Sequence, residues 1–368
     1  MILRLIRFIS LSLLPFALAA GPVEIRHAKN FGIENLGTYK LLSVSNTFRN
    51  STRTYRYALV PKSAELPALP DGVSVIRTPV ERVVAMETVF IGYLDALGHL
   101  DAIRAAATVD FISHPEVRQR VLAGQIASVQ IGQALDVEKL LLLQPELILT
   151  SISGDPAFDV PPKLERTGLP VVLSAGYMEQ TPLARAEWIK FMAAFFEEDA
   201  RADRLFNTIE RRYLDLAALT RTVEGKPSVF CGAPYSGVWH VPGGQSYTAR
   251  ALEDAGAHYL WHQDRSQGGI PLDIERVFLK AAGADIWINP SYYRSLSALL
   301  SADPRFEKFA ATQNGNVYNN TRQVGPAGGN AIWERGIVQP DDVLADLIHI
   351  FHPTLLPDHE FVFYEHLQ

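Results

Sequence analysis

Pro182–Thr220 reads PLARAEWIKFMAAFFEEDARADRLFNTIERRYLDLAALT, and this stretch decides the fold. No glycine interrupts it, and its first residue is a proline, which the first turn of a helix tolerates. Its apolar residues recur at helical spacing, and they are Leu183, Trp188, Met192, Phe195, Leu205, Phe206, Ile209, Tyr213 and Leu216. One helix over the whole stretch would span roughly 55 Å at about 1.5 Å per residue. A break at Glu197–Asp199 is the alternative, because Asp199 could cap a second helix.

Short strands rich in β-branched residues alternate with amphipathic helices on both sides of this stretch. Val83–Met86 before it and Ser228–Cys231 after it are typical of buried strands. Strand, helix and strand in this rhythm imply right-handed crossovers and parallel sheets. We therefore predict two α/β lobes, residues 80–182 and 222–368, bridged by a long helix within the helical segment 183–221. The alternative is one large α/β domain that contains a long helix.

Residues 21–79 form a distinct segment ahead of the first lobe. Three runs, Tyr39–Val44, Thr54–Val60 and Val73–Ile76, alternate as the strands of a small antiparallel sheet do. We find no catalytic or ligand-binding motif in this segment. The sequence therefore predicts a small N-terminal β appendage that packs on the first lobe.

Composition and charge exclude several classes of function. The chain has 368 residues, 48% of them hydrophobic and 20% charged, which is ordinary for a globular protein long enough for two or three domains. The formal net charge is -6 and no basic stripe is present, so we expect no nucleic-acid partner. The single cysteine, Cys231, can form no intrachain disulfide, and we expect it to be a small buried residue.

The first twenty residues, MILRLIRFISLSLLPFALAA, have the pattern of a secretory signal peptide. Arg4 and Arg7 precede an apolar run that is too short to be a good membrane-spanning helix, and Ala17–Ala20 supplies small residues for cleavage. No cysteine stands near that cleavage site, so we expect a cleaved product and not a lipoprotein. In a Gram-negative cell the mature protein would be periplasmic.

Motifs of common enzyme chemistries are missing from the sequence. We find no Gly-x-Ser-x-Gly elbow, no Walker loop and no dinucleotide fingerprint. His258 and His262 stand four residues apart, but no third ligand completes a metal site, so we interpret them as a surface pair. We expect no catalytic residues, no bound metal and no cofactor. A periplasmic enzyme of an unrecognised type stays open as an alternative.

Several motifs together resemble one family. They are Arg82–Ala85 followed by Tyr93–Gly98, then Leu135–Leu149 with its Pro145 before a strand, and Leu272–Val277 followed by Ala284–Ile288. Over about residues 80–352 the chain resembles the iron-siderophore and cobalamin periplasmic-binding proteins. The resemblance implies two lobes bridged by a long helix, with a ligand in the cleft between them. It also implies delivery of a ferric siderophore, cobalamin, haem or free metal to an inner-membrane ABC permease with its ATPase.

Loops beyond the carboxyl ends of the strands are where ligands bind in such sheets. Those of the second lobe are unusually aromatic, which suits a bulky ligand, and arginines there could bind the negative charge of a ferric chelate. Trp239 is included because it lies in a loop between glycines and prolines. The predicted ligand-binding residues are Glu87, Thr88, Tyr235, Trp239, Tyr247, Tyr292, Arg322, Trp333 and Arg335. We expect the other rings Trp188, Trp261 and Trp287 to belong to the core.

Glu138 and Glu275 match, by position, the two glutamates with which this family docks on arginines of the importer. The alternative is that each is a solvated glutamate at a helix start, stabilised by the helix dipole. The leading prediction is a binding protein for a ferric siderophore, and the runner-up ligand is cobalamin or haem.

Overall fold

The computed structural model describes residues 21–132, 134–155, 159, 163–164 and 167–368. The predicted signal peptide, residues 1–20, lies outside the described residues. No helix among the described residues is both long enough and apolar enough to cross a membrane.

A five-stranded sheet in the order β1-β2-β3-β4-β5 forms the N-terminal appendage. Its strands are β1 (Gly21–Pro22), β2 (Phe31–Asn35), β3 (Lys40–Val44), β4 (Tyr55–Pro61) and β5 (Val73–Thr78). The sheet was predicted to be antiparallel, but β4 and β5 pair in parallel. Two strands can pair in parallel only if the chain between them returns to the end of the sheet where the first strand begins. The long proline-rich connection between β4 and β5 makes this return. Phe31 from β2 packs on the ring of Trp188, with centroids 4.8 Å apart, so the appendage shares the core of the first lobe.

The first lobe is built on a parallel sheet in the order β12-β11-β6-β7-β8. Its strands are β6 (Val83–Ala85), β7 (Ile103–Ala106), β8 (Ala127–Ser128), β11 (Leu147–Ser151) and β12 (Val171–Ser174), with a hairpin of β9 (Gln130–Ile131) and β10 (Ala134–Leu135) beside them. Its helices are α1 (Val89–Leu97), α2 (Pro115–Leu122), α3 (Val137–Leu143) and the short 3-10 helices η1 (Leu100–Ala102), η2 (Val109–Phe111) and η3 (Gly176–Met178). Gly98 ends α1 in the left-handed conformation, φ 72°, which glycine adopts readily because it has no Cβ.

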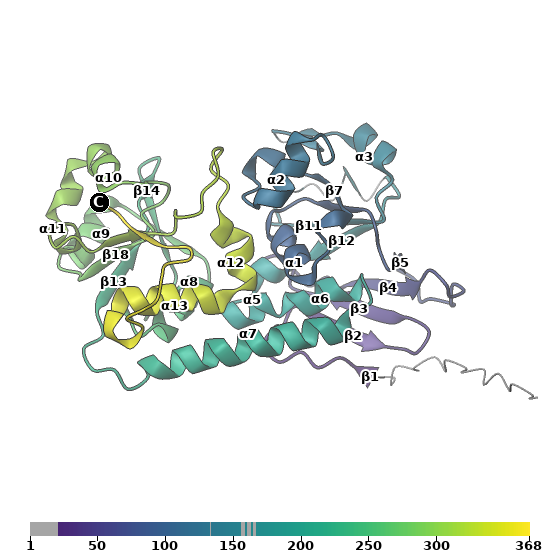
Figure 1. The fold of residues 1–368 in the computed structure, drawn as a ribbon, viewed down its shortest axis with the longest axis horizontal. Helices are drawn as coiled ribbons and strands as arrows, with labels where there is room; N and C mark the ends of the chain where they lie inside the picture. Colours follow the sequence, from purple (N-terminus) through teal and green to yellow (C-terminus); the bar gives the residue numbers. More distant parts are fainter. Residues whose placement is uncertain (1–20, 133, 156–158, 160–162, 165–166) are drawn as a thin grey trace, which may run out of the picture.

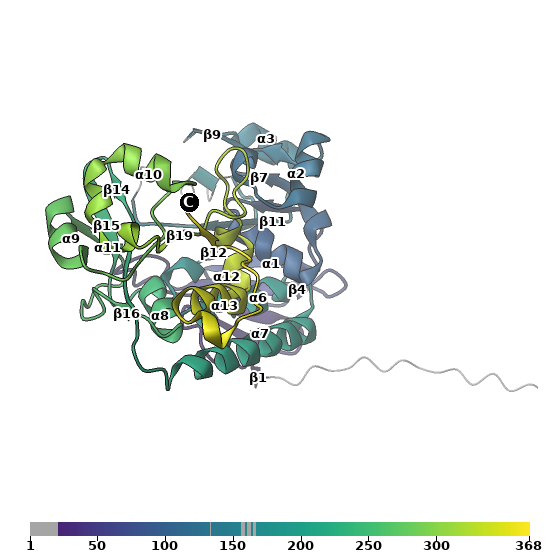
Figure 2. The same cartoon turned by 60° about the vertical axis from the view of Figure 1, so that its left-hand side comes forward.

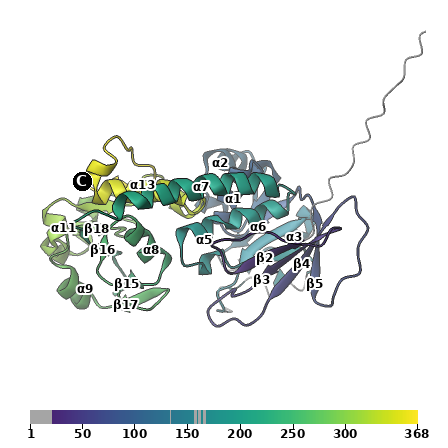
Figure 3. The same cartoon turned by 90° about the horizontal axis from the view of Figure 1, so that it is seen from below.

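The stretch that decides the fold forms three helices, α5 (Pro182–Ala186), α6 (Trp188–Ala194) and α7 (Asp199–Thr220). The chain has the break that was left open as the alternative to one helix, and Glu197 there has a positive φ of 61°. Asp199 does not cap α7, however, because the helix begins at Asp199 and Glu198 precedes it without a side-chain cap. The 22-residue α7 runs beneath both lobes (Figures 1 and 3).

The second lobe repeats the architecture with a sheet in the order β16-β13-β18-β19-β20, parallel except for β20. Its strands are β13 (Ser228–Cys231), β16 (His258–Tyr259), β18 (Ile286–Ile288), β19 (Val317–Asn319) and β20 (Glu365–His366), and a second small sheet holds β14 (Pro234–Tyr235), β15 (Val238–Pro242) and β17 (Gly269–Leu272). Its helices are α8 (Tyr247–Asp254), α9 (Ile274–Ala281), α10 (Leu296–Ala302), α11 (Ala310–Gln313), α13 (Pro340–Phe351), η4 (Pro304–Lys308), η5 (Ala331–Trp333) and η6 (Pro353–Leu355). α12 (Arg335–Val338) follows η5 in the chain, but its Ile337 and Val338 are buried in the core of the first lobe.

Each lobe has its own main hydrophobic core, and α7 contributes to both. Ala202 and Phe206, in its first half, are buried in the core of the first lobe. Tyr213 and Ala217, in its second half, are buried in the core of the second. The chain is therefore two α/β lobes bridged by a long helix and not one large α/β domain.

Candidate functional site

Arg185, at the end of α5, lies where the two lobes meet. Its Nη2 donates to the carbonyl oxygen of Tyr177 at 2.7 Å, and its Nε donates to that of Glu179 at 3.2 Å. The guanidinium lies 4.2 Å from the ring centroid of Tyr247, which belongs to the second lobe. Burial lowers the pKa of Arg185, and the neighbouring Tyr247, Tyr93 and Glu179 oppose that shift. Within the described residues no carboxylate forms a salt bridge with Arg185, so this cation has no direct counter-ion.

Tyr177 connects Arg185 to the strand ends of the first lobe. Its hydroxyl lies 2.7 Å from the carbonyl oxygen of Ile152, just beyond β11, and its ring is 40% exposed. Burial, with the negative charges of Asp159 and Glu87, raises the pKa of Tyr177 to about 12. At neutral pH this residue is therefore an uncharged, accessible ring at the edge of the lobe.

Glu87 was predicted to bind ligand, and the structure places it at the same strand ends. Its carboxylate accepts the backbone N–H of Ser151 at 2.6 Å and the hydroxyl of Ser151 at 3.0 Å. Burial raises the pKa of Glu87, while both hydrogen bonds from Ser151 oppose the shift. Because both oxygens are engaged, Glu87 orients the end of β11 in this structure.

Two aromatic residues of the second lobe, Tyr247 and Trp333, lie near this junction. Tyr247 is the first residue of α8, whose Ser246 hydroxyl caps the helix by accepting the N–H of Ala249 at 3.1 Å. Trp333 ends η5, is 50% exposed, and lines a small cavity of about 30 Å³ with Tyr247 and Asn320. We call Glu87, Ser151, Tyr177, Arg185, Tyr247 and Trp333 the interlobe site.

A glycine-rich finger, residues 323–331, joins the lobes a second time. Figure 2 shows it rising above α12 between the two lobes. The finger folds back on itself, since the N–H of Gly325 donates to the carbonyl oxygen of Gly329 at 2.7 Å. A Cβ at Gly329 would lie 2.0 Å from the carbonyl oxygen of Phe111, so only glycine permits this contact with the first lobe. Just beyond the finger, the buried carboxylate of Glu334 accepts the N–H of Ser113 at 2.8 Å.

A cavity of about 460 Å³ lies between α2 and the finger. The charged residues that line it are His114, Arg118, Glu334 and Arg335. The hydrogen bond from His114 to Asp95 raises the pKa of His114, and burial opposes that shift. Arg335 donates from Nη2 to Gln323 at 2.7 Å, and its Nε is buried with no hydrogen-bond partner in the described part of the chain.

Trp239 is a core residue, and the prediction that it lines the ligand site is wrong. Its side chain is 0% exposed, and its Nε1 donates to the carbonyl oxygen of Cys231 at 2.9 Å. The predicted loop around it is a hairpin of β14 and β15, turned by Ser236 and Gly237 with positive φ values of 49° and 82°. Side chains alternate between the two faces of β15, and the side chain of Trp239 lies on the face that is buried in the core of the second lobe. A serine-glycine pair between Tyr235 and Val238 is the turn signal that could have shown this.

The other predicted ligand residues are scattered over both lobes. Thr88 precedes α1 and is partly buried. Tyr235 and Tyr292 are 70% and 67% exposed, and Tyr292 stacks on Tyr293 with centroids 4.8 Å apart. Arg322 is exposed at the base of the finger. As predicted, Trp188, Trp261 and Trp287 are buried, as is Cys231, and His258 and His262 are exposed with rings 4.7 Å apart.

Glu138 and Glu275 are exposed in the first turns of α3 and α9, and the two helix starts have the same local structure. Asp136 caps α3 by accepting the N–H of Lys139 at 2.9 Å, and Asp273 caps α9 by accepting the N–H of Arg276 at 2.7 Å. α3 and α9 both lie on the sides of their lobes away from α7 (Figures 1 and 3).

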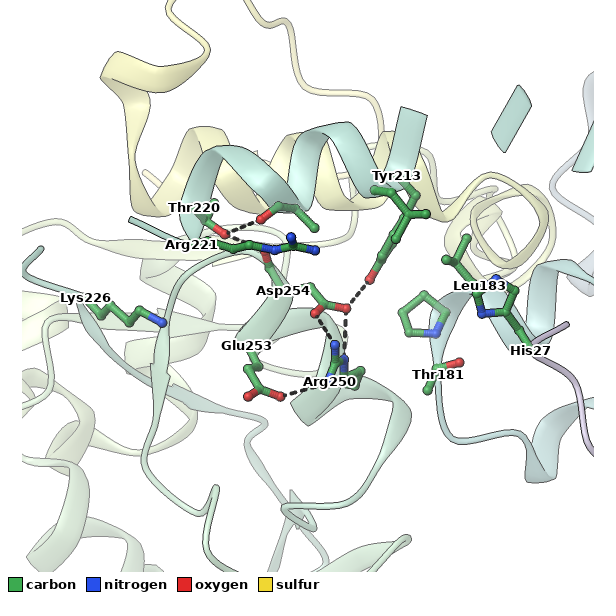
Figure 4. A pocket seen from close by; sticks show the side chains of 13 residues that line it. His27, Thr181, Leu183, Tyr213, Thr220, Arg221, Lys226, Arg250, Glu253 and Asp254 are labelled. Carbon is green, nitrogen blue, oxygen red and sulfur yellow. Dashed lines mark hydrogen bonds and ion pairs between the residues drawn. The ribbon is translucent and has the colours of Figure 1, made fainter. Parts of the chain in front are cut away.

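Another cavity, of about 380 Å³, lies against α7 and α8 and is shown in Figure 4. Three of its charged residues, Arg250, Glu253 and Asp254, pair with one another. Arg250 forms salt bridges with Asp254 at 2.8 Å and Glu253 at 3.3 Å, and the hydroxyl of Tyr213 donates to Asp254 at 2.8 Å. Arg221 and Lys226 also line this cavity and form no salt bridge among the described residues. The carboxylates of Glu253 and Asp254 stand beside these cations, so the cavity suits an anionic ligand less well than the interlobe site does.

Sequence reasoning missed Arg185 and Tyr177. The signal for Arg185 was present, because it stands in a buried amphipathic run with no acidic residue three or four positions away to pair with on the helix. Tyr177 gave no such signal, since its place depends on how β12 and η3 pack beside β11.

The chain consists of two parallel-sheet lobes that share one long helix, and cationic and aromatic groups lie where the lobes meet. This is the architecture of a bilobal binding protein. Residues 83–323 match the sequence profile of the periplasmic binding proteins, and the chain belongs to that family. The predicted resemblance is thereby confirmed, and the family is one of substrate-binding transport proteins.

Relatives of this chain include two uncharacterized lipoproteins of Methanocaldococcus jannaschii. One is 26% identical over 298 residues, which are 77% of this chain and 68% of the relative. The other is 24% identical over 314 residues, which are 82% of this chain and 76% of the relative.

Solved structures share the fold. A possible iron-binding periplasmic solute-binding protein from Staphylococcus epidermidis superposes with a TM-score of 0.57 at 19% identity, covering 75% of this chain and 100% of that one. A periplasmic heme-binding protein from Pseudomonas aeruginosa superposes with a TM-score of 0.55 at 21% sequence identity, covering 75% of this chain and 94% of that one. A structure of the Fe3+-hydroxamate transport system from Saccharomonospora viridis superposes with a TM-score of 0.55 at 18% sequence identity, covering 74% of this chain and 94% of that one.

Proposed function

We propose that this protein captures a ferric siderophore at the interlobe site and delivers it to an inner-membrane ABC permease. The observation that carries the proposal is Arg185, a half-buried cation between the lobes that no carboxylate of the described chain neutralises. A guanidinium held by two backbone carbonyls presents its remaining donors in a fixed direction, which suits the anionic oxygens of a chelate. The similar solved structures are named for iron, heme and Fe3+-hydroxamate, and the last of these is a ferric chelate with anionic oxygens.

Aromatic rings complete the proposed site. Trp333 and Tyr177 are 50% and 40% exposed, and Tyr247 already carries the guanidinium of Arg185 on its face. Such rings supply contact area for a bulky ligand at little conformational cost. The proposal includes the remaining predicted residues Thr88, Tyr235, Tyr292, Arg322 and Arg335 as contacts for the ligand's outer parts.

Delivery is proposed to use Glu138 and Glu275, one on each lobe. Both are exposed, and both stand two residues after an aspartate that caps the helix. Each lobe therefore carries a glutamate in an equivalent, exposed position. Carboxylates at two separated points would orient the protein on a partner with basic sites. We also propose that residues 1–20 are removed on export to the periplasm, which the mass of the mature protein would show.

Tryptophan fluorescence tests the ligand site, because the five tryptophans differ sharply in exposure. Trp188, Trp239, Trp261 and Trp287 are at most 8% exposed, so a ligand at the interlobe site should quench mainly Trp333. We expect a ferric siderophore to give saturable quenching that Trp333→Phe largely removes, while calorimetry shows that the variant still binds. Cobalamin, haem and free metal ions are titrated in parallel. Failure of every ferric chelate to bind, or binding of cobalamin alone, would overturn the proposal.

A further inference from the structure

Each of the helices α3 and α9 carries an exposed leucine one turn after its glutamate. Leu142 is 84% exposed and Leu279 is 85% exposed, and they are the two most exposed large apolar side chains that the structure describes. Leu142 follows Glu138 by four residues, and Leu279 follows Glu275 by four. Residues four apart share a helix face, so each lobe presents a carboxylate and an isobutyl group side by side.

The orientation of each pair is fixed by the residues around it. Leu140 and Val277, two positions after the glutamates, are both 0% exposed and hold the opposite face of each helix in its lobe. The caps at Asp136 and Asp273 fix where the helices begin. The two pairs are therefore presented by matching local structures on different lobes.

A single exposed leucine needs no explanation, but this duplication does. At 84% and 85% exposure neither side chain contributes much to the core of its lobe, so the fold does not require an apolar residue at either position. We propose that Leu142 and Leu279 are apolar anchors that insert into two equivalent sockets of the permease, each formed by a basic residue and an apolar depression. This inference rests on the proposed delivery to a permease through Glu138 and Glu275.

The duplication also defines the kind of partner. Two like Glu–Leu pairs fit a membrane protein built from two like subunits, which offers the same socket twice. The charge pairs would steer the encounter, and the leucines, desolvated on docking, would lower the dissociation rate. Glu275 already pairs with Arg305 at 3.0 Å, whereas Glu138 forms no salt bridge within the described residues. The socket for α9 must therefore compete with Arg305, and the socket for α3 meets a free carboxylate.

The first part of the test identifies contacts in cells that express the full chain. A photo-crosslinking amino acid is placed at position 142, at position 279, or at position 66 as the control. Leu66 is 60% exposed and lies between β4 and β5 in the appendage. We expect positions 142 and 279 to crosslink to one and the same polytopic permease and position 66 not to. Crosslinks from 142 and 279 to unrelated proteins, or to none, would overturn the inference.

The second part measures docking on that purified permease in nanodiscs, with Leu142→Gln, Leu279→Gln and the control Leu66→Gln. Each anchor variant should weaken docking about tenfold, because one buried leucine is lost, and the control should leave it unchanged. Ligand binding by the isolated protein should be the same for all three. Unchanged docking of both leucine variants, with docking weakened by Glu138→Ala, overturns the anchors but not the proposed delivery. Unchanged docking of Glu138→Ala and Glu275→Ala as well would overturn both.

Discussion

Glu334, just before α12, binds Ser113 of the first lobe through both polar hydrogens of that serine. The backbone N–H of Ser113 donates at 2.8 Å, and its hydroxyl donates to the other carboxylate oxygen of Glu334. Glu334 is 2% exposed, and burial raises its pKa while the bonds from Ser113 oppose the shift. Ile337 and Val338 of α12 are buried in the core of the first lobe, so this contact helps to hold α12 there.

Glu334→Ala should loosen the attachment of α12 to the first lobe, and with it the path of the chain between the two lobes. The variant leaves the N–H and hydroxyl of Ser113 without this acceptor, which costs about 1–3 kcal/mol for buried groups. We expect a lower melting temperature and a broader distance distribution between spin labels on the exposed residues Gln119 and Glu307. Glu116→Ala, an exposed glutamate on α2, is the control and should change neither. An unchanged distance distribution in Glu334→Ala would show that the contact does not restrain the lobes.

Gly329→Ala should detach the finger from the first lobe. Its Cβ would lie 2.0 Å from the carbonyl oxygen of Phe111, a backbone atom that cannot turn aside. Gly325→Ala is a matched control on the same finger, since its Cβ would meet nothing nearer than 3.6 Å. Hydrogen exchange around residues 111–113 should quicken in Gly329→Ala alone. Equal exchange in the two variants would contradict the contact.

Glu187→Gln should destabilise the protein through the appendage. Glu187 is 0% exposed, accepts the N–H groups of Arg26, His27 and Ala28 between 2.7 and 3.1 Å, and pairs with Lys190 at 3.2 Å. Breaking one partner of a buried charge network costs about 3–5 kcal/mol. Denaturant unfolding measures the loss.

The effect of Glu187→Gln should also depend on pH. Burial would raise the pKa of Glu187, but the backbone N–H groups of Arg26, Ala28 and His27 and the charge of Lys190 lower it overall. A lowered folded-state pKa means that the stabilisation is present above the unfolded-state value and is lost as the pH falls. The difference from the wild type should therefore be largest at neutral pH and shrink in acid. Asp203→Asn removes a half-exposed partner of Lys190 and should lower the free energy of unfolding far less than Glu187→Gln does. A difference that grew in acid would refute this assignment.

Tyr247→Leu should weaken the contact between the lobes at Arg185. The guanidinium lies 4.2 Å from the ring centroid, and a cation on an aromatic face contributes about 0.5–2 kcal/mol. Tyr247→Phe keeps the ring and should keep most of that stability. Equal unfolding free energies for the leucine and phenylalanine variants would exclude a role for the ring face.

The fold followed from the sequence because its signals are local and long. The periodic stretch Pro182–Thr220 indicated helix and allowed a break near Glu197, and the structure has both. The motifs around Glu138 and Glu275 indicated helix starts, which the structure contains, but the caps by Asp136 and Asp273 were not predicted. The parallel pairing of β4 with β5 was beyond such reasoning, since it depends on the path of the connection between them.

The site was less predictable because its members come together only in three dimensions. Tyr247 and Trp333 were predicted from their aromatic loops and lie near the junction of the lobes, but Trp239 was misplaced because a two-residue turn converts its loop into a hairpin. Arg185 and Tyr177 come from opposite ends of the η3–α5 segment, and only folding places their neighbour Tyr247 over the guanidinium.

The most direct test of an anionic ligand at the interlobe site is calorimetric titration of ferric chelates of different charge into the wild type and Arg185→Gln. Arg221→Gln, at the exposed end of α7, serves as the control. We expect a negatively charged ferric siderophore to bind the wild type and the control alike, and Arg185→Gln at least about tenfold more weakly, as loss of a charge-assisted hydrogen bond implies. Equal affinity for the wild type and a folded Arg185→Gln would contradict the proposed role of Arg185.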